Sequence, residues 1–163
     1  MKNQGFEAGF DYDLLLAQLS ALCEDCTEPL PLLSNTAALL GQAMLDLNWV
    51  GFYFRKKDEL LLGPFQGQVA CMRIQWCRGV CGTAAATDMT QLVPDVHRFP
   101  GHIACDSRSQ SEIVVPIHSG QQVIGVLDID SPRLNRFSEA DQAGLEGIIH
   151  LLESKLDWNS FLR

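Results

Sequence analysis

The stretch EIVVPIHSGQQVIGVLDID, residues 112–130, decides the fold. It holds two apolar runs, 112–118 and 122–129, which are separated by the polar link Ser119-Gly120-Gln121. Short runs rich in Val and Ile that flank a glycine-containing turn are typical of two antiparallel strands joined in a hairpin. The sequence therefore predicts an antiparallel sheet with this hairpin inside it.

The preceding part of the chain repeats this strand-like pattern. NWVGFYFR, residues 48–55, is rich in aromatic residues and Val, and a polar turn at 56–58 separates it from the apolar run 59–65. These two runs predict a second hairpin. Shorter strands are expected at 69–74 and 92–93.

Helical spacing of apolar residues marks the two ends of the chain. Helices are predicted at 11–24, at 34–47 and after Ser138, which caps the last one with Asp141 three residues later. Residues 27–33 are predicted to be a loop, because they contain Pro29 and Pro31. A short helix is expected within 78–87, and a long loop at 94–111, where functional residues are often found.

This order of elements predicts an α+β domain: an antiparallel sheet with the terminal helices packed on it. A length of 163 residues corresponds to about one domain. The expected division is a single domain over 1–163, in which 1–33 form an N-terminal helix and loop, and 34–157 form the core and the closing helix.

Charge and hydropathy exclude several classes of partner. The formal net charge of −8 disfavours binding to nucleic acid or to an anionic membrane surface. No apolar run reaches the roughly 18 residues that a spanning helix needs. The start of the chain, residues 1–13, lacks the basic and apolar parts of a secretory signal. A cytoplasmic location is therefore expected.

Six cysteines are more than a cytoplasmic protein needs for structure. Cys71, Cys81 and Cys105 fall in predicted loops or at their edges. A redox thiol needs a second thiol within disulfide reach, and Cys105 has two candidates, Cys71 and Cys81. Each cysteine taken alone is as readily explained as a small buried hydrophobic residue, but the three together favour redox chemistry.

A zinc site is the weaker alternative for the same region. Its ligands would be His97, His102, Cys105 and Cys81, but zinc ligands usually occur in pairs about two to five residues apart. Cys23 and Cys26 form a CxxC pair at a helix end, where a structural or incidental role is expected. The sequence therefore predicts no metal ligand.

Three carboxylates and one tryptophan are the remaining candidates. Glu112 opens one strand of the 112–130 hairpin, while Asp128 and Asp130 share a face at the end of the other, so all three are expected to converge. Like charges this close raise the pKa of at least one carboxyl, which then donates a proton. A charge cluster on an edge strand is the simpler alternative. Trp49 either walls a pocket or packs in the core.

Several motifs together give the chain a family resemblance. These are NWVGFYF (48–54), LLLGPFQGQVAC (60–71), RGVCGTA (78–84), DVHRFPGHIACDSRSQSEIVVPI (95–117) and GVLDIDSP (125–132). The chain resembles the free methionine-(R)-sulfoxide reductases, enzymes built on a GAF domain, over about residues 34–146. The resemblance implies a single GAF-like domain that reduces free L-methionine-(R)-S-oxide to L-methionine.

The resemblance also implies a role for each candidate residue. Cys105 matches the nucleophile, Cys71 the favoured resolving cysteine and Cys81 the alternate one. The substrate-binding residues match Trp49, Glu112, Asp128 and Asp130. Cys77 adds a thiol where the family usually has none.

The implied cycle passes from a sulfenic acid to an intramolecular disulfide, which a thioredoxin-like dithiol protein reduces. NADPH enters only indirectly through that reductant, and no bound cofactor is implied. The alternative is a non-catalytic GAF module that senses a small molecule. Both the enzyme and the sensor interpretation leave open whether the terminal helices form a homodimer.

Overall fold

The structure, a computed structural model, describes residues 10–161. Its elements are α1 (Tyr12–Asp25), α2 (Pro29–Ala43), β1 (Trp49–Lys56), β2 (Glu59–Gly67), β3 (Arg73–Gln75), α3 (Gly79–Thr87), β4 (Gln91–Val93), the 3₁₀ turn η1 (Val96–Arg98), β5 (Ser111–Ser119), β6 (Gln122–Ser131), α4 (Glu139–Lys155) and α5 (Trp158–Phe161). Residues 1–9, which are part of the segment 1–13 that was predicted to lack a secretory signal, lie outside this range. Within the described range, no helix is long and apolar enough to span a bilayer.

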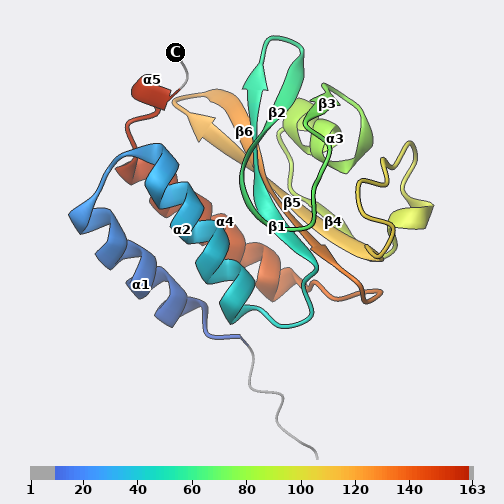
Figure 1. The fold of residues 1–163 in the computed structure, drawn as a ribbon, viewed down its shortest axis with the longest axis horizontal. Coiled ribbons are helices and arrows are strands. Elements are labelled where there is room, and N and C mark those ends of the chain that lie inside the picture. Colours follow the sequence, from blue (N-terminus) through green and yellow to red (C-terminus); the bar gives the residue numbers. More distant parts are fainter. Residues whose placement is uncertain (1–9, 162–163) are drawn as a thin grey trace, which may run out of the picture.

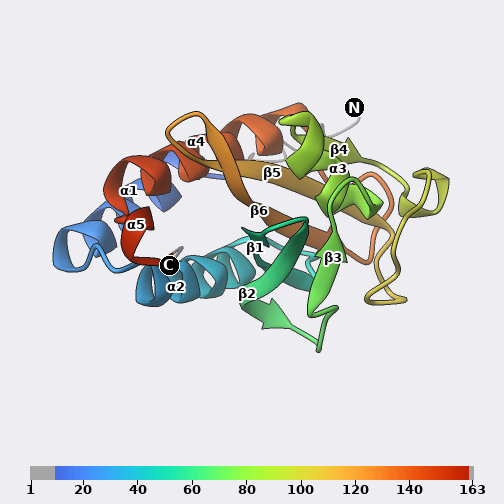
Figure 2. The same ribbon diagram turned by 90° about the horizontal axis from the view of Figure 1, so that it is seen from above.

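One six-stranded sheet organises the molecule. Its strand order is β3-β2-β1-β6-β5-β4, and every neighbouring pair is antiparallel. Figure 1 shows α1, α2 and α4 on one side of the sheet and α3 on the other, and the view from above in Figure 2 agrees. The predicted α+β class, the antiparallel sheet and the packing of terminal helices are confirmed.

The two faces of the sheet bury different hydrophobic clusters. The larger cluster joins the terminal helices to inward-facing strand residues such as Phe52, Ile113 and Leu127. The smaller cluster lies under α3 and includes Trp49 and Tyr53. Because side chains alternate along a strand, a single run such as β1 supplies both clusters.

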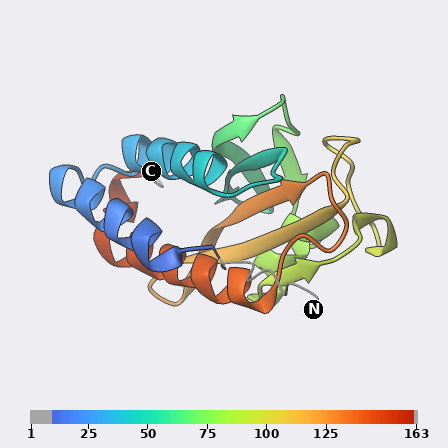
Figure 3. The ribbon, with the colours of Figure 1, turned by 90° about the horizontal axis from the view of Figure 1, so that it is seen from below.

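The terminal helices are held together by side chains as well as by packing. Figure 3 shows α1 beside α4, and there the Tyr12 hydroxyl donates a hydrogen bond of 2.7 Å to Asp141 Oδ1. Asp141 also completes the predicted cap of α4: the Ser138 hydroxyl accepts from the Asp141 N–H, and Asp141 Oδ2 accepts from the Ser138 N–H.

Both predicted hairpins are present. In the second one, Gly120 has a φ of +62°, the left-handed region that a tight turn requires and glycine adopts without strain. The strand expected at 69–74 is shorter, because pairing with β2 begins only at Arg73. The short helix α5 was not predicted from the sequence.

The prediction of a loop over 27–33 is wrong. Helix α2 begins at Pro29, which occupies its first position, and Pro31 lies in the same first turn. Proline is tolerated there, because the N–H groups of a first turn have no partner within the helix. The helix also ends at Ala43, four residues before the predicted end at Leu47.

Two glycine substitutions test the close packing of the sheet. At Gly125 in β6, an added Cβ would overlap the Tyr53 carbonyl oxygen and lie 2.8 Å from the Phe54 ring. We expect Gly125→Ala to lower the free energy of unfolding by about 1–3 kcal/mol. The matched variant Gly147→Ala adds the same methyl to α4, where the nearest atom is Leu16 Cδ1 at 3.8 Å.

Gly147→Ala should therefore raise the free energy of unfolding by about 0.5–1 kcal/mol, because alanine is the better helix former. Urea unfolding of both variants measures the two changes. Equal effects of the two substitutions would contradict this description of the sheet.

Candidate active site

Strand register builds one row of functional side chains across the sheet. Trp49 of β1 is paired with Asp130 of β6, and Asp130 is paired with Glu112 of β5. Two pairs further along, Gly51 lies opposite Asp128. Directly paired residues, and residues two apart on one strand, share a face. All three predicted carboxylates are therefore brought together on the face that α3 covers.

Trp49 is both a core residue and a pocket wall. Its side chain is 4% exposed and stacks on Phe65 with ring centroids 5.3 Å apart, while its Nε1 donates to the Gln68 carbonyl at 3.1 Å. A Cβ at Gly51 would lie 2.6 Å from the Trp49 ring, so glycine there leaves room for the indole. The two interpretations of Trp49 are compatible.

The three candidate cysteines divide into a pair and a free thiol. Cys71 and Cys105 form a disulfide with their Cα atoms 5.6 Å apart, which is one of the two pairings left open by the sequence. Cys81 is a buried free thiol in the first turn of α3, and its Sγ lies 4.0 Å from Glu112 Oε1. The Tyr53 hydroxyl donates to the Cys71 carbonyl at 2.9 Å and so fixes the loop that carries this half of the disulfide.

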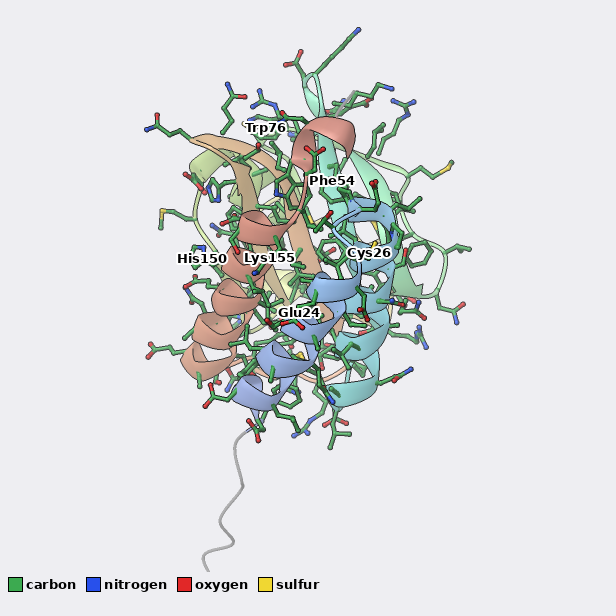
Figure 4. All side chains as sticks on the ribbon, turned by 90° about the vertical axis from the view of Figure 1, so that its left-hand side faces the viewer. Glu24, Cys26, Phe54, Trp76, His150 and Lys155 are labelled. Carbon is green, nitrogen blue, oxygen red and sulfur yellow. A yellow bond between two sulfur atoms is a disulfide. The ribbon has the colours of Figure 1, made fainter. Side chains whose placement is uncertain are left out.

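The other three cysteines lie elsewhere. Cys77 is exposed at a backbone φ of +66° just before α3. Cys23 is buried in the larger hydrophobic cluster, and Figure 4 shows Cys26 on the helical side of the sheet, opposite the carboxylate face. The structural or incidental interpretation of the CxxC pair is consistent with this position.

One pocket is lined by most of the candidate functional residues. Its lining includes Trp49, Cys81, Cys105, Glu112, Asp128 and Asp130, together with Tyr53, His102 and Ser109. The start of α3, from Gly79 to Cys81, also lines it, and no side chain caps this helix. Backbone N–H groups at a helix start attract anions, so the pocket has one acidic wall and one wall suited to an anion.

Burial sets the ionisation of the acidic wall. Burial, and then the negative charge of Asp128, raise the pKa of Glu112 well above its usual value. Burial and the same neighbour raise the pKa of Asp130, and burial raises that of Asp128 to about 6. Burial, followed by Asp128, also raises the pKa of the Cys81 thiol. The cluster therefore holds protons near neutral pH, as expected from the sequence.

Sequence reasoning missed the residues that hold the long loop against β1. Asn48 Nδ2 donates to Asp106 Oδ2 and to Ser109 Oγ, both at 3.0 Å. The Arg108 guanidinium binds the same carboxylate and holds the pKa of Asp106 below its usual range. These contacts fix residues next to Cys105. The only sequence signal was the position of Asn48 directly before Trp49.

The four residues of the alternative zinc site are not assembled. Cys105 Sγ is bonded to Cys71, and His97 is exposed and lies outside the pocket lining. His102 does reach the pocket, with Nε2 3.8 Å from Glu112 Oε2. Burial, with the nearby His97, lowers the pKa of His102, which favours its neutral form.

An antiparallel sheet with helices on both faces and a small-molecule pocket under α3 defines a GAF domain, and the GAF family model matches residues 28–156. The free methionine-R-sulfoxide reductase of Escherichia coli strain K12 is 50% identical over 145 residues, which cover 89% of this chain and 88% of that protein.

Two solved structures are similar as well. The reduced form of fRMsr from Staphylococcus aureus has a TM-score of 0.88 and 49% identity, and the match covers 91% of this chain and 97% of that one. The free methionine-R-sulfoxide reductase of Neisseria meningitidis, solved in complex with its substrate, has a TM-score of 0.86 and 46% identity over 90% of this chain and 88% of that one. The chain belongs to the GAF-domain family of free methionine-R-sulfoxide reductases.

The buried carboxyl of Asp128 makes the free energy of unfolding depend on pH in a way that can be tested. Its pKa is about 6 in the folded protein against 3.8 for an ordinary aspartate carboxyl, so the folded state binds more protons between these values. Stability that is present below about pH 4 is lost as the pH rises to about 6, by up to about 3 kcal/mol. We therefore expect Asp128→Asn to become progressively more stable than the wild type over this interval.

Urea unfolding at several values between about pH 4 and pH 7 measures this difference. Asp58→Asn, at an exposed carboxyl in the turn before β2, is the matched control and should follow the wild type. A gap between Asp128→Asn and the wild type that does not change with pH would contradict the assignment.

Proposed function

We propose that the protein reduces free L-methionine-(R)-S-oxide to L-methionine, with Cys105 as the nucleophile. The observation that carries the proposal is the Cys71–Cys105 disulfide beside a pocket lined by three carboxyls. The S. aureus and N. meningitidis relatives were both solved in complex with substrate, which supports the same substrate class here.

The pocket offers a complementary group for each part of a free amino acid. The substrate ammonium fits the acidic wall of Glu112, Asp128 and Asp130. Its carboxylate fits the uncapped start of α3 at Gly79, where backbone N–H groups and the helix dipole favour an anion. A methionine residue inside a protein chain has neither charge, so the site favours the free amino acid.

The acidic wall also prepares the sulfoxide for attack. A sulfoxide oxygen is a poor leaving group until it is protonated or strongly hydrogen bonded. Because its pKa is raised, the Glu112 carboxyl keeps a proton that it can donate to this oxygen. Cys105 then attacks the sulfur: the sulfoxide oxygen ends on Cys105 as a sulfenic acid, and methionine leaves as the thioether.

The second half of the cycle resets the enzyme. The Cys71 thiol attacks the Cys105 sulfenic acid, which forms the disulfide and releases water. An external dithiol protein of the thioredoxin type then reduces the disulfide by thiol–disulfide exchange and is itself oxidised. NADPH supplies these electrons indirectly, by re-reducing that protein.

Cys71 is a better resolving residue than Cys81. The Cys81 thiol lies among carboxyls, and burial with the charge of Asp128 raises its pKa, so little thiolate forms there. Cys77 is an exposed free thiol, whereas Cys71 is bonded to Cys105. The family membership and the disulfide favour an enzyme over a GAF sensor. A cytoplasmic location stays a prediction.

The substrate is tested with purified protein, dithiothreitol and each methionine sulfoxide epimer. We expect methionine from the free R epimer, and little from the S epimer or from a peptide that contains the R epimer. Chromatography of the free amino acids measures the product. Absence of methionine from the free R epimer would rule out the proposed activity.

The nucleophile is tested by Cys105→Ser, because a hydroxyl in this position is a far weaker nucleophile than a thiolate. We expect loss of turnover with both dithiothreitol and thioredoxin, by about a thousandfold or more. The matched variant Cys77→Ser replaces an exposed thiol and should keep wild-type turnover. Activity retained in Cys105→Ser would move the nucleophile to another residue.

The resolving role is tested by Cys71→Ser. Without Cys71 the sulfenic acid has no adjacent thiol, so thioredoxin-driven turnover should fall strongly, whereas dithiothreitol, which attacks the sulfenic acid directly, should sustain more of it. Cys81→Ser should keep thioredoxin-driven turnover. Peptide mapping of the oxidised proteins under non-reducing conditions identifies the bond formed in each, and a Cys81–Cys105 disulfide in the wild type would contradict the assignment.

A further inference from the structure

The Cys81 thiol, which the proposed redox cycle does not use, lies beside two carboxyls of the pocket. Cys81, Glu112 and Asp128 are all buried, and one ligand atom from each lies within 4.8 Å of the other two. In a tetrahedral zinc site, sulfur and oxygen ligands are about 3.6 Å apart, given bonds of about 2.3 and 2.1 Å. Cys81 Sγ and Glu112 Oε1 are already 4.0 Å apart. Movements of about 1 Å would close the set around one ion.

A second observation concerns Asp128. This side chain is 6% exposed and lines the pocket, yet its Oδ1 makes no hydrogen bond with any of the described residues. A buried carboxylate oxygen without a partner is costly, and a cation at this position would compensate it. His102 lies beside the cluster, with Nε2 3.8 Å from Glu112 Oε2.

We propose that Cys81, Glu112 and Asp128 bind Zn²⁺ or another thiophilic divalent cation, and that the bound ion excludes the substrate from the pocket. On binding, the Cys81 thiol releases its proton and forms the S–metal bond, with no change in oxidation state. Any carboxyl that is protonated releases its proton as well, so affinity falls as the pH is lowered.

In the oxidised protein, metal binding through Cys81 can be distinguished from metal binding by the redox pair. Cys71 and Cys105 are joined in the disulfide while Cys81 remains a free thiol. A metal bound by the redox pair would be lost on oxidation, whereas a metal bound through Cys81 is retained. Metal binding by the oxidised protein needs no turnover, so its failure is distinguishable from failure of the proposed function. Only the exclusion of substrate rests on that function.

The test uses the full chain with Cys23→Ser, Cys26→Ser and Cys77→Ser, oxidised so that Cys81 is its one free thiol. Co²⁺ is the probe, because a cobalt–thiolate bond gives a charge-transfer absorption band. We expect the band to saturate at about one Co²⁺ per chain and to disappear on addition of Zn²⁺. Adding Cys81→Ser should abolish the band. Asp128→Asn should weaken Co²⁺ binding by about tenfold or more, whereas the exposed control Asp58→Asn should not.

Circular dichroism of each variant checks that it is folded. Absence of the band in the folded parent protein, or its persistence in Cys81→Ser, would overturn the metal site. Free methionine-(R)-S-oxide should compete with Co²⁺ and reduce the band. A band that is insensitive to saturating substrate would overturn the exclusion of substrate by the ion.

Discussion

The register between β1, β6 and β5 is the constraint on which the rest of the structure depends. It aligns Trp49, Asp130 and Glu112 in one row. A slip of one residue would move every side chain of a strand to the opposite face. The carboxyls would then point into the helical cluster, and Phe52 and Ile129 would point into the pocket. The larger cluster, which buries both of these residues completely, therefore specifies the register and with it the site.

The site is built at a cost in stability. Three carboxyls of the sheet and the Cys81 thiol of α3 gather in one small area, and burial opposes the ionisation of each. The opposite face offsets this cost, because α2 and α4 cover the strands there and α1 packs on these two helices. A single sheet thus joins an apolar face, which supplies stability, to a polar face, which holds protons near neutral pH.

Local sequence pattern predicted the sheet better than it predicted the helix boundaries. The hairpin at 112–130 and the strand after Asn48 are short apolar runs rich in Val, Ile and aromatic residues with polar turns beside them, so their strand type followed directly. Pro29 and Pro31 were misinterpreted as a loop, because proline excludes a helix interior but not a first turn. Convergence of the carboxyls followed from the hairpin. The hydrogen bonds of Asn48 to Asp106 and Ser109 link residues about 60 positions apart, and no local pattern encodes them.

The fold also separates the groups that must stay in place from those that must react. Trp49 and the carboxyls lie on neighbouring strands, where paired backbone holds their positions. Cys71 and Cys105 lie on two loops, and a bond between their sulfurs must form and break in each proposed cycle. Each loop is attached to β1 or to the residue before it by a hydrogen bond beside its cysteine: the Tyr53 hydroxyl holds the Cys71 carbonyl, and Asn48 holds Asp106. The strand that provides Trp49 thus also positions both loops of the disulfide, so its register sets the pocket wall and the disulfide together.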